Sequence, residues 1–512
     1  MGSPNESLQE RYGRQIVGML SCFDRVLIQG ILPGLSYSKG ITAYFYARGL
    51  LIKDYPHWAE PLTQQVRENV QQLAGAAGIE IQFIRKASVR KEEIVREVIH
   101  QRGDHPGLVC ILSAMERCST YKAHWRDGPP HLVATESKCL HYYLYFIDEE
   151  LGLCSVRVPT WPPFRLQIYF NGHRWLERQL KAKGIACRLL DNAFVWIADF
   201  DEAQGIADRF RSQKLHRKLD QLAALCCPVV HKLEATFHWS IDQAEYATDI
   251  VFHRRQDLQP IYENLTRRVI QAVKANDIAT FLGKKIYCTN DDEIGNRYDV
   301  RIEGTRIRHT MGPASIKMYD KFGHIFRVET TINDLTFLPH YREVEQRNGQ
   351  RIFRWAAMKK NIHSWHPLQE ALRAANRRYL EFLAALDTPS AGPRLLDRIC
   401  RTLRDGERSY RGLNFFSAPD AQMLQVLARG EFNIQGFRNK DLRHHLGYTL
   451  STGQTSRLLK SLRLHGLIKK TGRSYKYYLS SLGKQVVATA LYLKSLIITP
   501  RLAALHSAVS LA

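Results

Sequence analysis

The chain lacks the sequence signatures of several common protein classes. Its ten cysteines include no Cys-x-x-Cys pair, so we expect neither a zinc ribbon nor a disulfide framework, and a reducing compartment fits best. No run of about 18 apolar residues is present, and the first residues contain no apolar signal-peptide core, so we expect a cytoplasmic protein. Walker A, G-x-G-x-x-G, G-x-S-x-G and H-E-x-x-H patterns are also missing, which argues against a nucleotide-driven motor or a zinc protease.

Acidic residues are few relative to basic ones. The chain has 73 lysines and arginines against 50 aspartates and glutamates, a formal net charge of +23 and a pI near 9.6. Such an excess favours binding to polyanions, and nucleic acid is the commonest polyanion inside a cell. We therefore expect a nucleic-acid-binding protein of the bacterial cytoplasm and nucleoid, with DNA preferred over RNA. A homodimer is an open alternative to a monomer.

The chain is long enough for several domains, because 512 residues exceed the size of one ordinary hydrophobic core. Strand-like and helical runs alternate at first, which predicts an N-terminal α/β domain with a mixed sheet over residues 1–200. Helical segments followed by β-strands predict a central domain over residues 201–388. The segment "DTPSAGP" is the best linker candidate, and a C-terminal domain over residues 394–512 is expected beyond it. The predicted fold class is α+β.

A predicted β-hairpin, "SIKMYDKFGHIFRVETTIN" (Ser315–Asn333), carries an unusual set of polar residues. A three-residue loop, Phe322 to His324, pairs Lys317 with Glu329 and Tyr319 with Arg327. Because side chains alternate across a strand, this register places the polar residues on one face and the apolar ones on the other. The polar face consists of Lys317, Tyr319, Lys321, Arg327 and Glu329.

This polar face has the groups needed for attack on DNA by a tyrosine. Lysines beside Tyr319 favour its phenolate and can hold a phosphate, and Glu329 can bind a divalent cation. The predicted catalytic residues are Tyr319, Glu329, Lys317, Lys321 and Arg327. Two simpler interpretations stay open: a solvated sheet face with cross-strand ion pairs, and a basic surface that follows phosphates without chemistry.

A second group of acidic residues lies in "FHWSIDQAEYATDIVFHRRQ". Ser240, followed three residues later by Gln243, is typical of a capping box, so a helix is predicted to follow. On that helix three carboxylates share one face, and with Glu329 they could bind Mg²⁺ or Mn²⁺. They are Asp242, Glu245 and Asp249. Alternatively they face solvent. Separately, Asp24 lies in the apolar strand "CFDRVLIQG", where a buried carboxylate needs a partner or a metal.

Aromatic residues and arginines are interleaved between residues 142 and 175. In "VRVPTWPPFRLQIYF", for example, Trp161 lies between Arg157 and Arg165. Such a mixture suits stacking on single-stranded bases, although aromatic residues more often belong to a hydrophobic core. Both interpretations stay open.

The C-terminal segment is the most basic part of the chain, with 18 basic and 6 acidic residues between Arg394 and Lys484. "NKDLRHHLG" and "STGQTSRLLKSLRLHG" predict two helices, and "LIKKTGRSYKYYLSSLGKQVV" predicts a hairpin and a further helix. This order resembles the winged helix of MarR-type bacterial regulators over residues 420–490. The resemblance implies a second helix in the DNA major groove and a wing along the phosphates.

Carried over to this sequence, the resemblance implies eight nucleic-acid-binding residues. At the groove they are Ser456, Arg457, Lys460 and Arg463, and at the wing they are Lys469, Lys470, Arg473 and Lys476. A winged helix that only docks onto other proteins is the alternative.

The segment "GPASIKMYDKFGHIFRVETTIN" is similar to the S-x-x-x-x-Y-D-K…R-x-E strand pair of rolling-circle replication initiators from plasmids and filamentous phages. That resemblance implies a metal-dependent nickase that forms a phosphotyrosine bond with one DNA strand. The leading hypothesis is a DNA-binding protein of a mobile or replicating element, with strand-nicking or transposase-like activity and Mg²⁺ or Mn²⁺ as cofactor. A non-enzymatic winged-helix transcriptional regulator and an RNA-binding protein are the alternatives.

Overall fold

The computed structural model describes residues 6–86, 88–126, 128–286, 294–301, 304–387, 391–472, 474–500 and 502. The chain divides into two compact units, residues 1–387 (unit 1) and 388–512 (unit 2). The division falls at the segment in which a linker is expected from the sequence. None of the described helices is long and apolar enough to cross a membrane.

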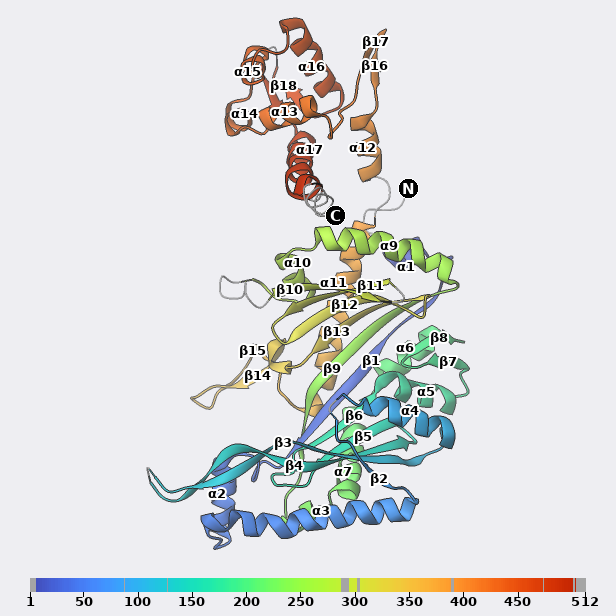
Figure 1. Cartoon of the computed structure of the whole chain (residues 1–512), viewed down its shortest axis with the longest axis vertical. Helices are drawn as coiled ribbons and strands as arrows, with labels where there is room; N and C mark the ends of the chain where they lie inside the picture. Colours follow the sequence, from blue (N-terminus) through green and yellow to red (C-terminus); the bar gives the residue numbers. More distant parts are fainter. Residues whose placement is uncertain are drawn as a thin grey trace, which may run out of the picture. The chain divides into compact units, whose positions relative to one another are not determined.

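Unit 1 is built on a large mixed sheet, to which eleven of the described strands belong (Figure 1). In spatial order they are β10 (Ile294–Arg301), β11 (Gly304–Met311), β12 (Ala314–Lys321), β13 (Ile325–Ile332), β9 (His238–Phe252), β1 (Ile16–Ile31), β6 (Leu166–Asn171), β5 (Gly152–Pro159), β4 (His131–Asp148), β3 (Gly107–His124) and β2 (Ile81–Phe83). Only the β2–β3 pair is parallel among these strands. The expected mixed α/β architecture is confirmed. The expected boundary at residue 200 lies inside unit 1, because β1 pairs with β9 in the same sheet.

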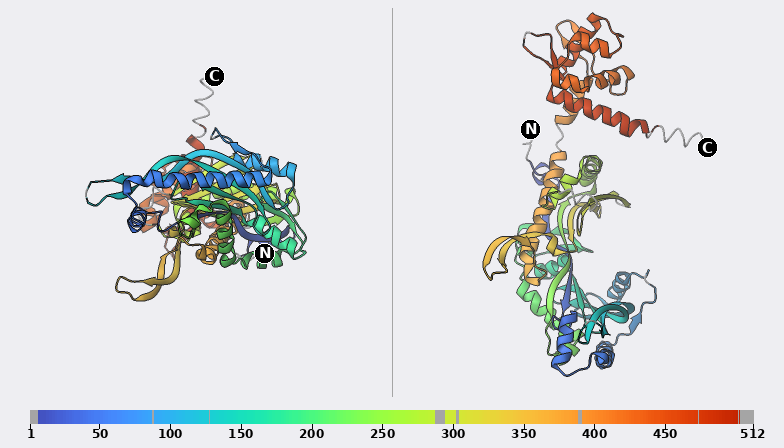
Figure 2. Two further views of the ribbon diagram at one scale, coloured as in Figure 1. Left: turned by 90° about the horizontal axis from the view of Figure 1, so that it is seen from below. Right: turned by 90° about the vertical axis from the view of Figure 1, so that its left-hand side faces the viewer.

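Helices and two small hairpins pack on and around this sheet. The helices are α1 (Leu8–Arg11), α2 (Ser38–Ala47), α3 (Tyr55–Ala77), α4 (Lys91–Arg102), α5 (Gly172–Ala182), α6 (Phe200–Asp208), α7 (Ser212–Cys226), α8 (Val229–Lys232), α9 (Arg255–Ala272), α10 (Ala275–Phe281) and α11 (Trp365–Leu386). The hairpins are β7 (Cys187–Leu190) with β8 (Ala193–Ile197), and β14 (Pro339–Glu345) with β15 (Arg351–Ala357), which projects from the body in Figure 2.

Helix α11 covers one face of β9 and β13 (Figures 1 and 2). Its Asn376 donates hydrogen bonds to the carbonyls of Tyr246 (3.0 Å) and Val328 (3.3 Å). Beneath it, the ring of Phe23 packs against Tyr246 and Trp365 with centroid distances of 5.1 and 4.3 Å. The opposite face of these central strands is therefore the one left for polar side chains.

The prediction of a helix after Ser240 is wrong, because residues 238–252 form strand β9. β9 lies between β1 and β13 and hydrogen-bonds to both. The β-branched and aromatic residues of "YATDIVF" also favour a strand. Pairing on both edges thus outweighs the local capping pattern, which spans only four residues.

The register predicted for the polar hairpin is confirmed. Strands β12 and β13 pair Lys317 with Glu329, Tyr319 with Arg327 and Lys321 with Ile325. A solvated face was one interpretation of this set, but every residue of β13 is buried. On β12 the residues Lys317, Tyr319 and Lys321 are partly buried, and the cross-strand ion pair between Lys317 and Glu329 is present.

Strand β1 contains an irregularity at the centre of the sheet. Phe23 pairs with Tyr246 and Val26 pairs with Ala244, so two residues of β1, Asp24 and Arg25, lie opposite the single residue Glu245. This arrangement is a β-bulge, which bends a strand and redirects a side chain. Asp24 thereby lies on the face opposite to the Phe23 ring.

Unit 2 has its own hydrophobic core, formed by residues such as Leu424, Leu427, Leu459 and Leu462. Its helices are α12 (Ala391–Cys400), α13 (Ala418–Leu427), α14 (Gly430–Gln435), α15 (Asn439–His445), α16 (Thr452–Leu464) and α17 (Ser481–Tyr492). Its hairpins are β16 (Leu403–Asp405) with β17 (Arg408–Tyr410), and β18 (Ile468–Lys470) with β19 (Tyr477–Leu479). The two helices, the hairpin and the further helix predicted for this segment are α15, α16, β18–β19 and α17.

Candidate functional site

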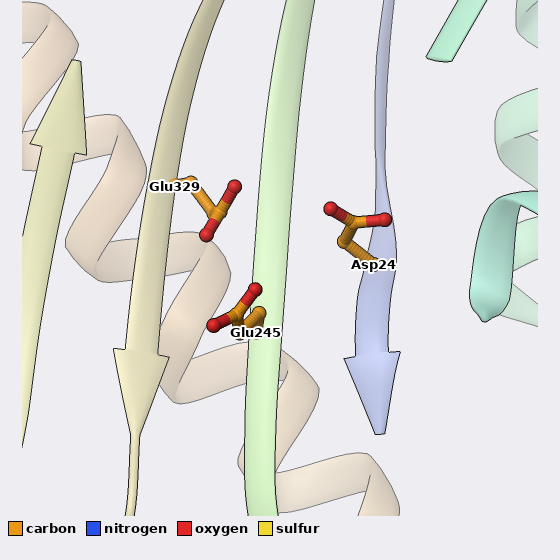
Figure 3. Close-up of side chains that lie close together, drawn as sticks. All are labelled: Asp24, Glu245 and Glu329. Carbon is orange, nitrogen blue, oxygen red and sulfur yellow. The ribbon is translucent and has the colours of Figure 1, made fainter. Parts of the chain in front are cut away.

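Three carboxylates from three adjacent strands converge on the sheet face that points away from α11 (Figure 3). Asp24 comes from β1, Glu245 from β9 and Glu329 from β13, and each offers an oxygen within 4.8 Å of the other two. We call this group the carboxylate triad. The β-bulge of β1 directs Asp24 toward Glu245, and the antiparallel register of β9 with β13 places Glu329 beside both.

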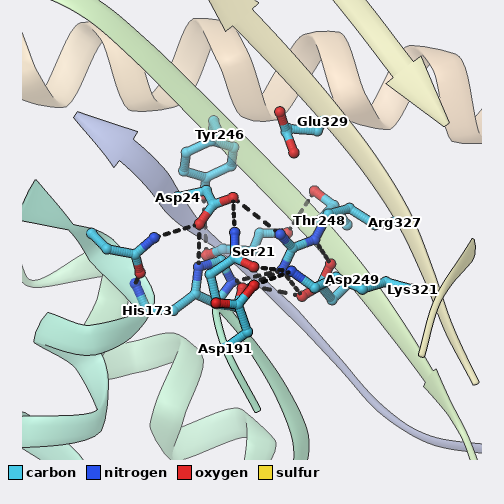
Figure 4. Close-up of polar contacts among 12 residues, drawn as sticks. Ser21, Asp24, His173, Asp191, Tyr246, Thr248, Asp249, Lys321, Arg327 and Glu329 are labelled. Carbon is cyan, nitrogen blue, oxygen red and sulfur yellow. Dashed lines mark hydrogen bonds and ion pairs between the residues drawn. The ribbon is translucent and has the colours of Figure 1, made fainter. Parts of the chain in front are cut away.

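Asp24 is held by a network of buried polar groups (Figure 4). Its oxygens accept hydrogen bonds from Asn171 (2.7 Å), Asn192 (2.6 Å) and the Nη1 of Arg327 (3.1 Å). The Nδ1 of His173 lies 3.3 Å away. Burial opposes ionisation, but Arg327 and His173 hold the pKa of Asp24 well below its usual value. Asp24 is therefore a carboxylate at neutral pH.

Arg327 joins two strands of this network through its guanidinium group. Its Nε and Nη2 each donate to Asp249, at 2.6 Å, and its Nη2 also donates to the carbonyl of Asn192 at 2.7 Å. Burial opposes ionisation, but this forked contact with Arg327 lowers the pKa of Asp249 to about 2. Asp249, a predicted metal ligand, is thus the anionic partner of a predicted catalytic arginine.

Helix α5 begins at the site and orients two of its groups. Asn171 caps the helix, because its Oδ1 accepts from the backbone N–H groups of His173 (3.0 Å) and Arg174 (3.1 Å). The same side chain donates to Asp24. Burial lowers the pKa of His173, but its neighbours Cys22, Asp24 and Asp249 raise this pKa well above its usual value.

The other two triad carboxylates differ in charge state. Burial and the neighbouring Glu329 raise the pKa of Glu245 to about 7. Glu329 is buried too, but Lys317, whose ammonium lies 2.5 Å from Oε1, keeps its pKa below the usual value. Lys317 also lies 3.9 Å from Glu245. The ammonium group of Lys317 therefore contacts two members of the triad, Glu245 and Glu329.

Tyr319 and Lys321 lie on the same strand as Lys317. The hydroxyl of Tyr319 donates to the Oε2 of Glu329 at 2.7 Å, and burial together with Glu329 raises its pKa well above the usual value. Lys321 donates to Asn192 and lies 3.7 Å from Asp191. Burial and Arg327 lower the pKa of Lys321. The lysines therefore do not produce a tyrosine with a depressed pKa.

The structure brings together most of the predicted site residues but not all of them. Lys317, Tyr319, Lys321, Arg327, Glu329, Glu245 and Asp249 belong to one network. Asp242 does not join the triad, because a second irregularity in the β1–β9 register leaves it between Ile241 and Gln243 without a partner residue. Burial and Asp334 raise the pKa of Asp242, and Lys360 opposes them.

In unit 2, most of the residues implied by the winged-helix resemblance reach the surface. Arg457, Arg463 and Lys469 are exposed. Lys460 instead forms an ion pair of 2.6 Å with Asp405, and the hydroxyl of Ser456 accepts from Asn439 at 2.9 Å. Lys470 and Lys476 are partly exposed, and Arg473 lies outside the described residues.

The sequence analysis did not predict Asn171, His173, Asp191 or Asn192 as site residues, and it kept Asp24 separate from the predicted metal ligands. One signal for the first pair was present: "YFNGHRW" places polar residues where a buried strand meets a helix. For Asn192, in the turn between β7 and β8, the sequence contains no local signal.

As a whole, the network has oxygen donors suited to a hard divalent cation and basic groups suited to a phosphate. Comparisons of the chain with protein-family models, with curated proteins and with solved structures found no match.

Proposed function

We propose that unit 1 is a divalent-cation-dependent enzyme that cleaves nucleic-acid phosphodiesters at the carboxylate triad. The observation that carries this proposal is the convergence of Asp24, Glu245 and Glu329 from three neighbouring strands. A rigid sheet that holds three carboxylates within 4.8 Å of one another creates a concentrated negative charge, which a divalent cation would stabilise. The net charge of +23 supports a polyanionic substrate.

The donor set fits Mg²⁺ or Mn²⁺. All three candidate ligands are carboxylate oxygens, and Glu245, whose pKa is raised by burial and by the neighbouring Glu329, would lose its proton on binding a cation. A cation there would stabilise the charge that develops on a phosphoryl oxygen. Lys317 and Lys321, whose side chains are 15% and 12% exposed, lie at the edge of the network and would bind the flanking phosphate oxygens.

Hydrolysis is the proposed reaction, in preference to attack by a tyrosine. Tyr319 keeps its proton, because burial and Glu329 raise its pKa, and a protonated phenol is a weak nucleophile. Its hydroxyl orients Glu329 instead. Tyr246, on the opposite face beneath α11, donates to the carbonyl of Ser21 and is unsuited to attack from the triad side.

The test uses labelled single-stranded and supercoiled DNA with Mg²⁺, Mn²⁺ or EDTA. Asp24→Asn and Glu329→Gln are expected to reduce cleavage at least about 100-fold, because each removes a ligand charge at nearly constant volume. Asp387→Asn is the matched control: this buried carboxylate pairs with Arg11 at 2.9 Å, outside the triad network. Tyr319→Phe is expected to retain cleavage within a few fold. A denaturant-resistant adduct that disappears in Tyr319→Phe would contradict hydrolysis, and absence of cleavage with every metal and substrate would contradict an enzyme.

For unit 2 we propose a winged helix that binds duplex DNA, with α16 in the major groove and β18–β19 along the phosphates. The order α13, α15, α16, β18, β19 and the exposed Arg457, Arg463 and Lys469 support this assignment. If unit 1 does not cleave nucleic acid, DNA binding by unit 2 would support the alternative, a non-enzymatic transcriptional regulator.

A further inference from the structure

A small basic cavity lies in unit 1 beside the central strands. Its volume is about 140 Å³, and its lining includes Gln29 of β1, Arg157 of β5, Arg165 and Trp161. The carboxylate triad and this cavity belong to different regions of the sheet, and no residue of the triad lines the cavity. We call it the Arg165–Trp161 pocket.

Strand pairing places the pocket and the triad on one face of the sheet. On β6, Asn171 lies on the triad face, since it donates a hydrogen bond to Asp24, and Tyr169 and Gln167 follow at alternate positions on the same face. Gln167 pairs with Gln29 on one side and with Arg157 on the other, and it accepts a hydrogen bond of 3.1 Å from Arg157. From Asp24 to Gln29 the strand runs roughly 15 Å.

Arg165 is the group that indicates a ligand. Its Nη2 donates to the carbonyl of Ser36 at 3.0 Å, but its Nε is buried and has no hydrogen-bond partner among the described residues. A buried donor without an acceptor is costly, and a guanidinium group matches the oxygens of a phosphate. The preceding residue, Phe164, is fully buried with a positive φ of 52°, a strained conformation that is typical of functional positions.

Trp161 supplies an aromatic surface beside that arginine. Its indole N–H donates to Thr120 at 2.8 Å, and Tyr55 packs against it edge to face with a centroid distance of 6.3 Å. The ring is thus fixed in orientation while remaining partly exposed at the cavity. Other aromatic residues of the same sequence segment, such as Phe164 and Phe170, are core residues.

We propose that the Arg165–Trp161 pocket binds single-stranded nucleic acid, with one phosphate on Arg165 and one base stacked on Trp161. Single strands are favoured over duplex because only unpaired bases expose their faces to an indole ring. The inference rests on the proposed function in one respect: the bound strand would continue along the sheet face to the triad. Its binding step requires no metal and no cleavage.

The experiment measures binding of the full chain to a fluorescent oligo-dT in EDTA, with excess unlabelled duplex to occupy unit 2. Arg165→Met and Trp161→Leu are expected to weaken binding about tenfold each. Gln29→Glu is expected to do the same by adding a negative charge to the lining without removing a packing contact, and melting curves identify any misfolded variant. Gln72→Glu, the same change on the exposed surface of α3, is expected to leave binding unchanged.

A local readout comes from photo-crosslinking. An oligonucleotide with 5-iodouracil is expected to form an adduct on the tryptic peptide that contains Trp161, and Arg165→Met is expected to reduce its yield. Equal affinity of wild type and all three pocket variants, or adducts only on other peptides, would overturn the proposal. Binding through the pocket without cleavage would contradict the proposed function alone, whereas triad-dependent cleavage by pocket variants with unchanged binding would contradict the pocket alone.

Discussion

Glu245 is the triad residue whose charge changes near neutral pH. Burial is the main cause that raises its pKa to about 7; Glu329 on β13 and Asp24 on β1 raise it further, whereas Lys317 on β12 lowers it. Below that pH a cation must displace the proton of Glu245, whereas above it the site is already ionised. We therefore expect the affinity for Mn²⁺ to rise by up to about tenfold per pH unit below pH 7 and to level off above it.

Calorimetric titration of Mn²⁺ at pH 6, 7 and 8 measures this dependence. Glu245→Gln removes the titrating group and is expected to flatten the profile while lowering the affinity. An affinity that stays constant from pH 6 to pH 8 in the wild type would contradict a triad that binds the cation through Glu245.

Residue identity alone predicted part of this site. A carboxylate in the apolar strand around Asp24 required a partner or a metal, and hairpin geometry placed Lys317 beside Glu329. The main partner of Asp24 could not be inferred, because Arg327 is 303 positions away and nothing local links the two segments. The depressed pKa expected for Tyr319 also failed, since burial and Glu329 act on its phenol more strongly than the lysines do.

At the scale of elements, the beginning of α5 is packed unusually close to β1. A Cβ atom on Gly172 would lie 2.1 Å from the carbonyl oxygen of Phe23. Gly172→Ala is therefore expected to push Asn171 and His173 away from Asp24. We expect a loss of about 1–3 kcal/mol in the free energy of unfolding and a weaker affinity for Mn²⁺, measured by urea denaturation and calorimetry.

The control for this substitution is Gly75→Ala in α3, where nothing lies within 4 Å of the added Cβ. It is expected to stabilise the protein by up to about 1 kcal/mol, because alanine favours the helix. Unchanged stability and Mn²⁺ affinity in Gly172→Ala would show that the contact between α5 and β1 does not position the site.

Elements with strong local patterns were predictable, and β9 was not. The β12–β13 hairpin and helices α15 and α16 follow from turn residues and periodicity within short windows. β9 has a helical capping signal at Ser240, and its strand conformation depends on pairing with β1 and β13. Because residues 238–252 form a strand and not a helix, Asp242 lies apart from Glu245 and Asp249 and is not part of the candidate metal site.

At the scale of the whole molecule, the two units are expected to work separately. The triad and its network lie within residues 1–387, and unit 2 has an independent core. A fragment of residues 1–387 should therefore bind Mn²⁺ like the full chain. A fragment of residues 388–512 should bind duplex DNA, and Arg457→Ala should reduce the slope of log affinity against log salt by about 1.

Calorimetry on the first fragment and binding isotherms at several salt concentrations on the second are the measurements. A unit 2 fragment that folds but has no affinity for duplex at low salt would support docking onto protein instead. The sequence indicated the division near residue 388, since proline, glycine and serine mark it. It could not indicate that residues 1–200 and 201–388 share a sheet, because the β1–β9 pairing leaves no local trace.

The pairing of β1 with β9 also determines when the triad can form during protein synthesis. Ile31 pairs with His238, so β1 leaves the ribosome roughly 200 residues before its partner, a delay of roughly 10 to 40 s at about 5 to 20 residues per second. Glu329 follows later still. β6 (Leu166–Asn171) is itself made long after β1, so for most of that interval β1 has no neighbouring strand of the sheet, and its edge toward β9 stays open to other chains until β9 is made. The carboxylate triad therefore cannot assemble until residue 329 has been made.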